Sequence, residues 1–226
     1  MRRLWVVGLA WAAALATMAL AAPASADGSS TWTVTVTNLT PPGPGAPGSQ
    51  PLSPPLFVVH SSRADVWSVG AIASHGVAAI AEDADNRVLE SVLPQLPGVR
   101  AVFTGAGGPI PSGQSRAFTV RTSGRFDRLS VLTMLVNTND AFTGLDAARL
   151  GGRGGTLERM AYDAGSERNN ELRGFIPGPC CNHPFVRDPE GELIRPHPGI
   201  SGVGELDPAL YGWQDPVARF TIQRAA

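Results

Sequence analysis

The clearest strand in the sequence is Thr31-Trp32-Thr33-Val34-Thr35-Val36-Thr37. β-Branched and aromatic residues occupy both of its faces, which is typical of a strand. A second alternating segment closes the chain, Pro216-Val217-Ala218-Arg219-Phe220-Thr221-Ile222. Because a sandwich often completes a sheet by placing its last strand beside an early one, we expect these two segments to be neighbours.

Between these two segments the sequence has further strand patterns. They cover residues 56–60, 99–104, 116–122, 129–136 and 157–162. Gly-Gly-Pro and Ser-Gly turns separate the three middle segments, and this hairpin spacing predicts antiparallel pairing. The length of the chain fits one all-β domain or a small mixed one.

Other stretches predict helices and loops. Ala-rich apolar spacing over residues 71–81 and again over 87–93 predicts one or two short helices, which we expect to cap the sheet. Residues 41–55 and 165–215 are rich in Pro and Gly and predict loops. So long a loop as the second one is uncommon in a compact domain unless it is functional or clamped.

The first 26 residues have the pattern of a secretory signal peptide. Arg2 and Arg3 precede an apolar run over residues 4–20, and Ala24-Ser25-Ala26 offers small residues for cleavage. The alternative is an uncleaved membrane anchor. We expect a secreted or periplasmic domain over residues 27–226, with no transmembrane span after cleavage.

Composition limits the classes of partner. The chain has 18 basic and 19 acidic residues, and its formal net charge is −1. Nucleic-acid binding is therefore not expected, because neutralising phosphates needs clustered positive charge. A hydrophobic content of 43% is enough for a buried core.

Acidic residues gather after two of the expected strands. Asp140 and Asp146 follow the 129–136 segment, while Asp163 and Glu167 follow the 157–162 segment. Neighbouring carboxylates repel one another unless a cation lies between them. Carboxylate and carbonyl oxygens without His or Cys favour Ca²⁺ over Zn²⁺. The alternative is that these Asp and Asn residues only form turns.

Three segments of the chain resemble the spondin N-terminal domain, in a bacterial form. They are Met134-Leu135-Val136-Asn137-Thr138-Asn139-Asp140-Ala141-Phe142-Thr143-Gly144-Leu145-Asp146, Tyr162-Asp163-Ala164-Gly165-Ser166-Glu167 and the closing residues 216–222. Further matches are residues 33–40, Leu52-Ser53-Pro54 and Ala81-Glu82-Asp83. The Asp-Ala-Gly-Ser-Glu string is the most specific of them.

The resemblance implies a fold and a metal site. It implies an all-β fold, a C2-like antiparallel β-sandwich, with one or two short helices and a long C-terminal loop. It also implies a calcium ion held by Asp140, Asp163 and Glu167. Animal members of the family have Asp at the position of Glu167, but Glu can also chelate calcium.

Cys180 and Cys181 are adjacent, so the only disulfide possible within the chain is a vicinal one. Such a ring would stiffen its loop without closing a long segment of chain. Free or intermolecular thiols are a second possibility. A soft-metal site with His183, completed by His197, is a third.

Together these features predict an exported calcium-binding β-sandwich that acts as a binding or adhesion module rather than as an enzyme. Its partner would be an extracellular protein or glycan. One alternative is a metal-dependent hydrolase that uses Asp140 and Asp163 to activate water. Another is a redox or metal-handling protein centred on Cys180 and Cys181.

Overall fold

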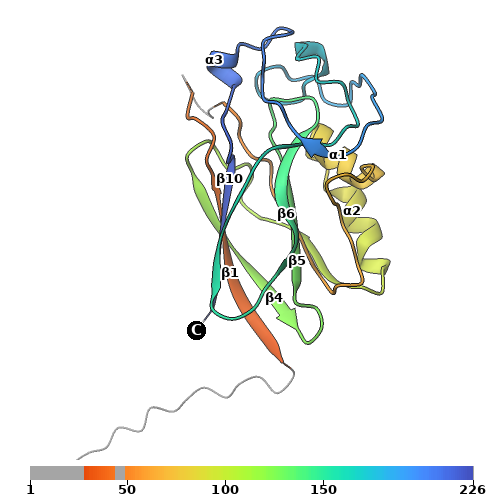
Figure 1. The fold of residues 1–226 in the computed structure, drawn as a ribbon, viewed down its shortest axis with the longest axis vertical. Coiled ribbons are helices and arrows are strands. Elements are labelled where there is room, and N and C mark those ends of the chain that lie inside the picture. Colours follow the sequence, from red (N-terminus) through yellow and green to blue (C-terminus); the bar gives the residue numbers. More distant parts are fainter. Residues whose placement is uncertain (1–27, 44–48, 226) are drawn as a thin grey trace, which may run out of the picture.

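The computed structural model describes residues 28–43 and 49–225 of the 226-residue chain. The expected signal peptide lies outside these residues. Within them the structure has two antiparallel β-sheets and a few short helices (Figure 1). The expected all-β sandwich is therefore confirmed.

The smaller sheet contains the two ends of the described chain. Its strand order is β4-β1-β10-β7. The strands are β1 (Ser29–Asn38), β4 (Ser115–Ser123), β7 (Gly154–Arg159) and β10 (Ala218–Arg224). β1 pairs with β10 along seven residues, from Trp32 opposite Arg224 to Asn38 opposite Ala218. The expected pairing of the first and last strands is confirmed.

The larger sheet has the order β3-β2-β5-β6-β8-β9. Its strands are β2 (Leu56–His60), β3 (Val99–Thr104), β5 (Arg128–Met134), β6 (Ala141–Arg149), β8 (Tyr162–Asp163) and β9 (Arg195–Pro196). β8 and β9 are short additions to the edge beside β6, and they pair Ala141 with Asp163 and Asp163 with Arg195.

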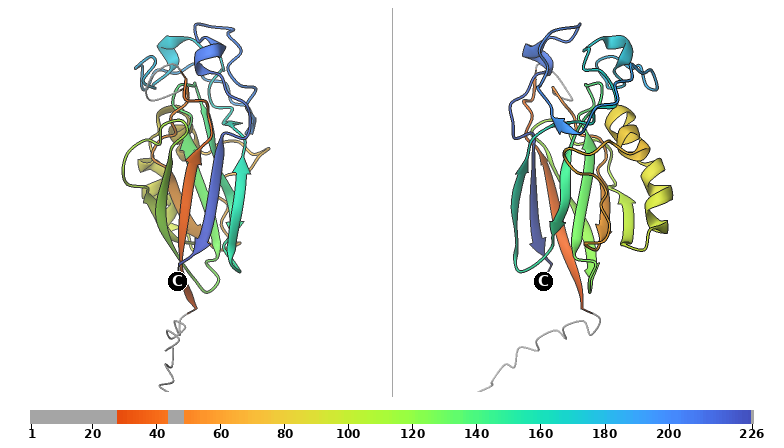
Figure 2. Two further views of the ribbon diagram at one scale, coloured as in Figure 1. Left: turned by 90° about the vertical axis from the view of Figure 1, so that its left-hand side faces the viewer. Right: turned by 45° about the vertical axis from the view of Figure 1, so that its right-hand side comes forward.

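The helices are short, and the first two of them cover one face of the larger sheet. The α-helices are α1 (His75–Asp83), α2 (Arg87–Val92) and α3 (Pro208–Tyr211), and the 3₁₀ turns are η1 (Leu93–Gln95) and η2 (Arg173–Phe175). Ser74 caps α1 by accepting a hydrogen bond from the Val77 amide. Figures 1 and 2 show α1 and α2 outside the larger sheet, on the side away from β1 and β10.

Two hydrophobic layers explain the strand sequences. β2 is buried along its whole length, because Phe57 and Val59 belong to the core between the sheets while Leu56 and Val58 face the core beneath α1 and α2. β1 buries alternate residues only, since one of its faces is directed to solvent. Burial on both faces identifies the larger sheet as the central layer of the molecule.

Two predictions from the sequence were wrong. Strands β3, β4 and β5 do not pair in sequence order, because β4 belongs to the smaller sheet while β3 and β5 both flank β2. Residues 141–149 form strand β6, although no strand was expected there. Turn spacing reveals strand ends, but burial against the opposite layer decides which strands pair.

The 165–215 segment is mostly loop, as expected, and contains only η2, β9 and α3. Figures 1 and 2 show it folded over one end of the sandwich, opposite the end where β10 finishes. Loops from both edges of the larger sheet meet at this end.

Candidate metal site

Asp140 ends the tight connection between β5 and β6. The Thr138 hydroxyl donates to the Leu135 carbonyl and accepts from the Ala141 amide, so the turn is held by its own side chain. Asp140 is fully buried. One carboxylate oxygen, Oδ2, accepts from the backbone amides of Ser166 and Glu167 at 2.8 and 3.0 Å. The other oxygen, Oδ1, has no hydrogen-bond partner among the described residues.

The Asp-Ala-Gly-Ser-Glu string forms the turn that follows β8. Asp163 is paired with Ala141, the residue after Asp140. The Asp163 carboxylate accepts from the Gly165 amide at 2.7 Å, and Gly165 adopts a φ of 67°, a backbone conformation that favours glycine. The turn therefore directs the next two amides onto Asp140, which brings the two predicted acidic segments together.

Glu167 ends this turn with its side chain fully buried. Within the described part of the chain, no donor forms a hydrogen bond of standard geometry with either carboxylate oxygen, although the Asp188 backbone amide is near enough to act against the rise in the pKa of Glu167. Its nearest positive group is Arg187, whose Nε lies 3.6 Å from Oε1. Burying a carboxylate without hydrogen-bond donors costs free energy. The two Glu167 oxygens are therefore available to a cation.

Asp163 is held differently from the other two carboxylates. Its Oδ2 accepts from Asn169 Nδ2 at 2.9 Å and from Arg195 Nε at 3.0 Å. Arg195 NH2 also forms an ion pair with this oxygen at 2.9 Å. Protein donors thus already satisfy Asp163 in this arrangement.

The electrostatics agree with an unneutralised acidic site. Burial, followed by the charge of Asp163, raises the pKa of Asp140 to about 7. Burial, followed by the charges of Glu82 and Asp140, raises the pKa of Glu167 to about 8. Both groups therefore resist ionising, and a nearby cation would favour their charged forms.

The donor set fits a hard divalent cation in part. Its atoms are carboxylate oxygens, the ligands that calcium prefers, and Asp140 and Glu167 together offer three unpartnered oxygens. Over residues 28–43 and 49–225, however, no three Asp, Glu, His or Cys side chains form a group that could hold a metal ion as they are arranged here. Asp163 would have to release a protein donor in order to join.

Asp146 is not part of this group. It lies in β6 and is exposed. Its Oδ2 accepts from Ser68 Oγ at 3.3 Å, and burial together with the charge of Asp65 raises its pKa. Asp146 therefore lies beside Ser68 and Asp65, away from the turn that gathers the other three residues.

Four charged or polar neighbours of the site were not predicted from the sequence. They are Glu82, Asn169, Arg187 and Arg195. Glu82 stands in the Ala-Glu-Asp string that resembles the family, so that match was a usable signal. Nothing in the sequence marks Arg187 or Arg195, because the 165–215 loop brings them in from far along the chain.

A vicinal disulfide joins Cys180 and Cys181, whose Cα atoms are 3.8 Å apart. It sits in a compact turn, where Asn137 Oδ1 accepts from the Cys180 amide and the Gly178 carbonyl accepts from the Cys181 amide. His197 is engaged elsewhere, since its Nε2 bonds to Asn169 Oδ1 and its ring packs on Trp213. The soft-metal alternative therefore lacks the ligand that would complete it.

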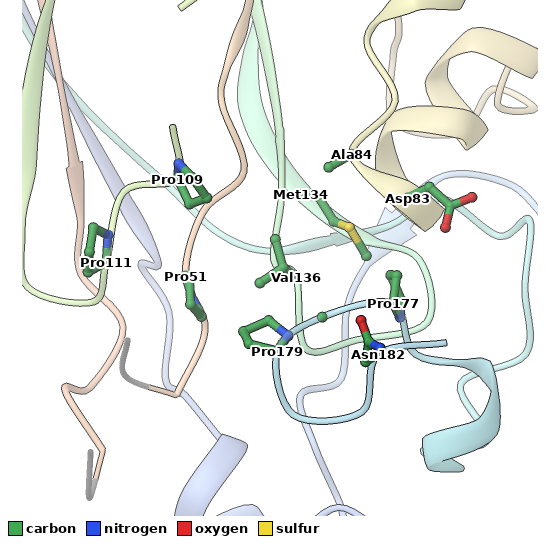
Figure 3. Close-up of a pocket in the computed structure, with 11 residues that line it drawn as sticks. Pro51, Asp83, Ala84, Pro109, Pro111, Met134, Val136, Pro177, Pro179 and Asn182 are labelled. Atoms are coloured by element: carbon green, nitrogen blue, oxygen red, sulfur yellow. The ribbon is translucent and has the colours of Figure 1, made fainter. Parts of the chain in front are cut away.

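A largely apolar pocket of about 480 Å³ lies beside this disulfide turn, whose residues Pro177, Gly178, Pro179 and Asn182 form part of its lining. Figure 3 shows Pro177, Pro179 and Asn182 on one side of it, with Pro51, Pro109 and Pro111 on the other. Asp83, at the end of α1, also lines it. The pocket and the acidic site thus share one end of the sandwich.

A family model described as Spondin_N matches residues 47–168. The match includes all three predicted ligands and ends one residue after Glu167, so it excludes the disulfide turn. No curated protein matches the chain. Among the helices of the described residues, none is long and apolar enough to span a bilayer.

Proposed function

The chain belongs to the spondin N-terminal domain family, and we propose that it is an exported binding or adhesion module whose loop end is ordered by one calcium ion. Membership of this family indicates an extracellular binding-type module. The calcium ion, its ligands and export from the cell are the parts that we propose.

The observation that carries the proposal is the set of three unpartnered oxygens on Asp140 and Glu167. Calcium would supply the positive charge that these buried carboxylates lack. Asp140 and Glu167 would hold it, with Asp163 as the third ligand. The ion would thereby tie the β5–β6 connection to the turn after β8.

Burial of the site favours a structural ion over a catalytic one. Asp140, Asp163 and Glu167 are all fully buried. A hydrolytic metal needs an open coordination position that a substrate can reach. The candidate partner, an extracellular protein or glycan, would contact the ordered loops around the site rather than the ion itself.

We expect calcium to raise the melting temperature of residues 27–226. Extracellular calcium modules bind in the range of ~10⁻⁴ to ~10⁻³ M. A ligand at tenfold its dissociation constant adds ~1.4 kcal/mol of stability, equivalent to ~3–6 °C for a protein of this size. Differential scanning calorimetry in excess chelator and in saturating calcium, paired with isothermal titration calorimetry, measures the effect.

Asp140→Asn and Glu167→Gln should each abolish most of this gain. Asp146→Asn is the matched control, because it removes one carboxylate from β6 without touching the site, and it should keep the full calcium response. A wild-type melt that is identical in chelator and in calcium contradicts the proposal. So does an equal loss in the control variant.

A further inference from the structure

The proposed calcium site has a second acidic wall, formed by the last turn of α1. Glu82 and Asp83 stand there, and Arg187 from the 165–215 loop reaches both of them. Arg187 Nε lies 2.5 Å from Glu82 Oε2, and its NH2 forms an ion pair with Asp83. The same Nε lies 3.6 Å from Glu167 Oε1. One guanidinium therefore lies between carboxylates from two different elements.

Arg187 neutralises Glu167 without satisfying it. The distance of 3.6 Å is too long for a hydrogen bond, and both Glu167 oxygens lack a donor among the described residues. Glu82 is the neighbouring charge that does most to raise the pKa of Glu167, after burial itself. Glu82 Oε2 and Glu167 Oε1 lie 2.5 and 3.6 Å from the same nitrogen, Arg187 Nε, so the two carboxylates are neighbours that share one cation.

Asp83 differs from Glu82 in having both oxygens engaged. Oδ1 accepts from the Phe185 amide at 3.0 Å, and Oδ2 pairs with Arg187. This pair anchors the arginine to α1. The NH2 group of Arg187 is thus held on Asp83, while its Nε faces Glu82 and Glu167.

Building on the calcium site proposed above, we propose that Glu82 is a further ligand of that site and that Arg187 sets its affinity by competing with calcium for Glu82 and Glu167. A guanidinium and a divalent cation cannot occupy the same oxygens, because both are positive. Calcium carries two charges and binds several oxygen ligands. It would therefore coordinate the Glu167 oxygens, which Arg187 does not hydrogen-bond. The competition ties the position of the loop that carries Arg187 to the calcium level.

Calcium titration of three variants by isothermal titration calorimetry tests this proposal. Glu82→Gln should weaken binding by about tenfold, because one charged ligand is lost. Arg187→Gln should tighten binding by about tenfold, because the competitor is gone. The same Arg187→Gln protein should melt at a lower temperature than wild type in chelator, because Glu82 and Glu167 then have no cation.

Arg168→Gln is the matched control for a general change of charge. Arg168 lies in the same loop and pairs with Asp188 at 3.4 Å. The Arg168→Gln substitution removes one positive charge from the loop but leaves Arg187 in place, so calcium affinity should change by less than about threefold. If Arg187→Gln does not fold, Arg187→Met keeps the apolar stem that packs on neighbouring residues but removes the charge, and it should also bind calcium more tightly than wild type.

The outcomes separate this inference from the proposed function. If wild-type protein binds calcium and Glu82→Gln binds it equally well, Glu82 is not a ligand. If Arg187→Gln and Arg168→Gln change the affinity by the same factor, Arg187 is not a specific competitor. If the wild-type protein binds no calcium, the proposed function fails and this inference fails with it.

Discussion

Folding buries the carboxylates of Asp140 and Glu167 although not all of their oxygens accept a hydrogen bond from the described residues. The first is half satisfied by the amides of Ser166 and Glu167, and neither side-chain oxygen of the second accepts a hydrogen bond from the described residues. Their raised pKa values, about 7 and about 8, express this deficit. At the residue scale, the site therefore destabilises the folded protein unless a cation is bound there.

This deficit predicts that the calcium-free protein loses stability as pH rises. Because both folded-state pKa values lie above the ordinary values of 3.8 and 4.5, the stabilising contribution of the protonated carboxyls is complete below pH ~4 and is lost as pH rises through about 7 for Asp140 and about 8 for Glu167. Each group contributes a slope of ~1.4 kcal/mol per pH unit within its window. Urea unfolding in chelator from pH 5.5 to 8.5 measures this decrease in the free energy of unfolding.

Glu167→Gln provides the comparison for this pH series. Burial lowers the pKa of His197 to about 4, so His197 contributes stability that is lost as pH falls below ~6.5, and this partly masks the carboxyl effect on the acid side. The difference between wild type and Glu167→Gln cancels the histidine contribution. A difference that does not change with pH would contradict the assignment of the slope to Glu167.

At the scale of elements, the site depends on one turn. β8 places Asp163 beside the start of β6, and the glycine of Asp-Ala-Gly-Ser-Glu reverses the chain so that Ser166 and Glu167 return to Asp140. Gly165 has two reasons to be glycine. Its φ is 67°, and a Cβ there would lie 2.5 Å from the Glu192 carbonyl oxygen.

Gly165→Ala should therefore destabilise the protein by ~1–3 kcal/mol and weaken calcium binding as well, because the turn that presents Glu167 is disturbed. Gly151→Ala is the matched control, since a Cβ at Gly151 meets nothing within 4 Å. Urea unfolding and calcium titration of both variants measure the effects. Equal stability of the two alanine variants would show that the turn tolerates a side chain.

At the scale of the whole molecule, stability comes from the layer between the two sheets. β10 fills the gap between β1 and β7, and it contributes Phe220 and Ile222 to the same core as Phe57 and Val59. The closing strand thus ties the end of the chain to its beginning. The site at the loop end rests on this shared core.

Phe220→Ala should cost ~3–5 kcal/mol, because Phe220 is fully buried and its removal leaves a cavity. The neighbouring Arg219 points outward and pairs with Glu158 on β7, so Arg219→Ala should cost at most ~1 kcal/mol. Chemical denaturation of both variants compares the two faces of β10. Similar losses would mean that the two faces of β10 contribute equally.

The sequence by itself determined the strands at both ends of the chain, the pairing of β1 with β10, the two short helices and the family. These follow from local alternation and from motif residues such as Asp163, Gly165 and Glu167. Only the tertiary structure decided that β4 leaves its sequence neighbours for the other sheet, that residues 141–149 form a strand, and that Arg187 and Glu82 border the acidic turn. The physical reason is that strand partners and ion pairs depend on which buried surfaces meet, and those surfaces come from segments far apart in the chain.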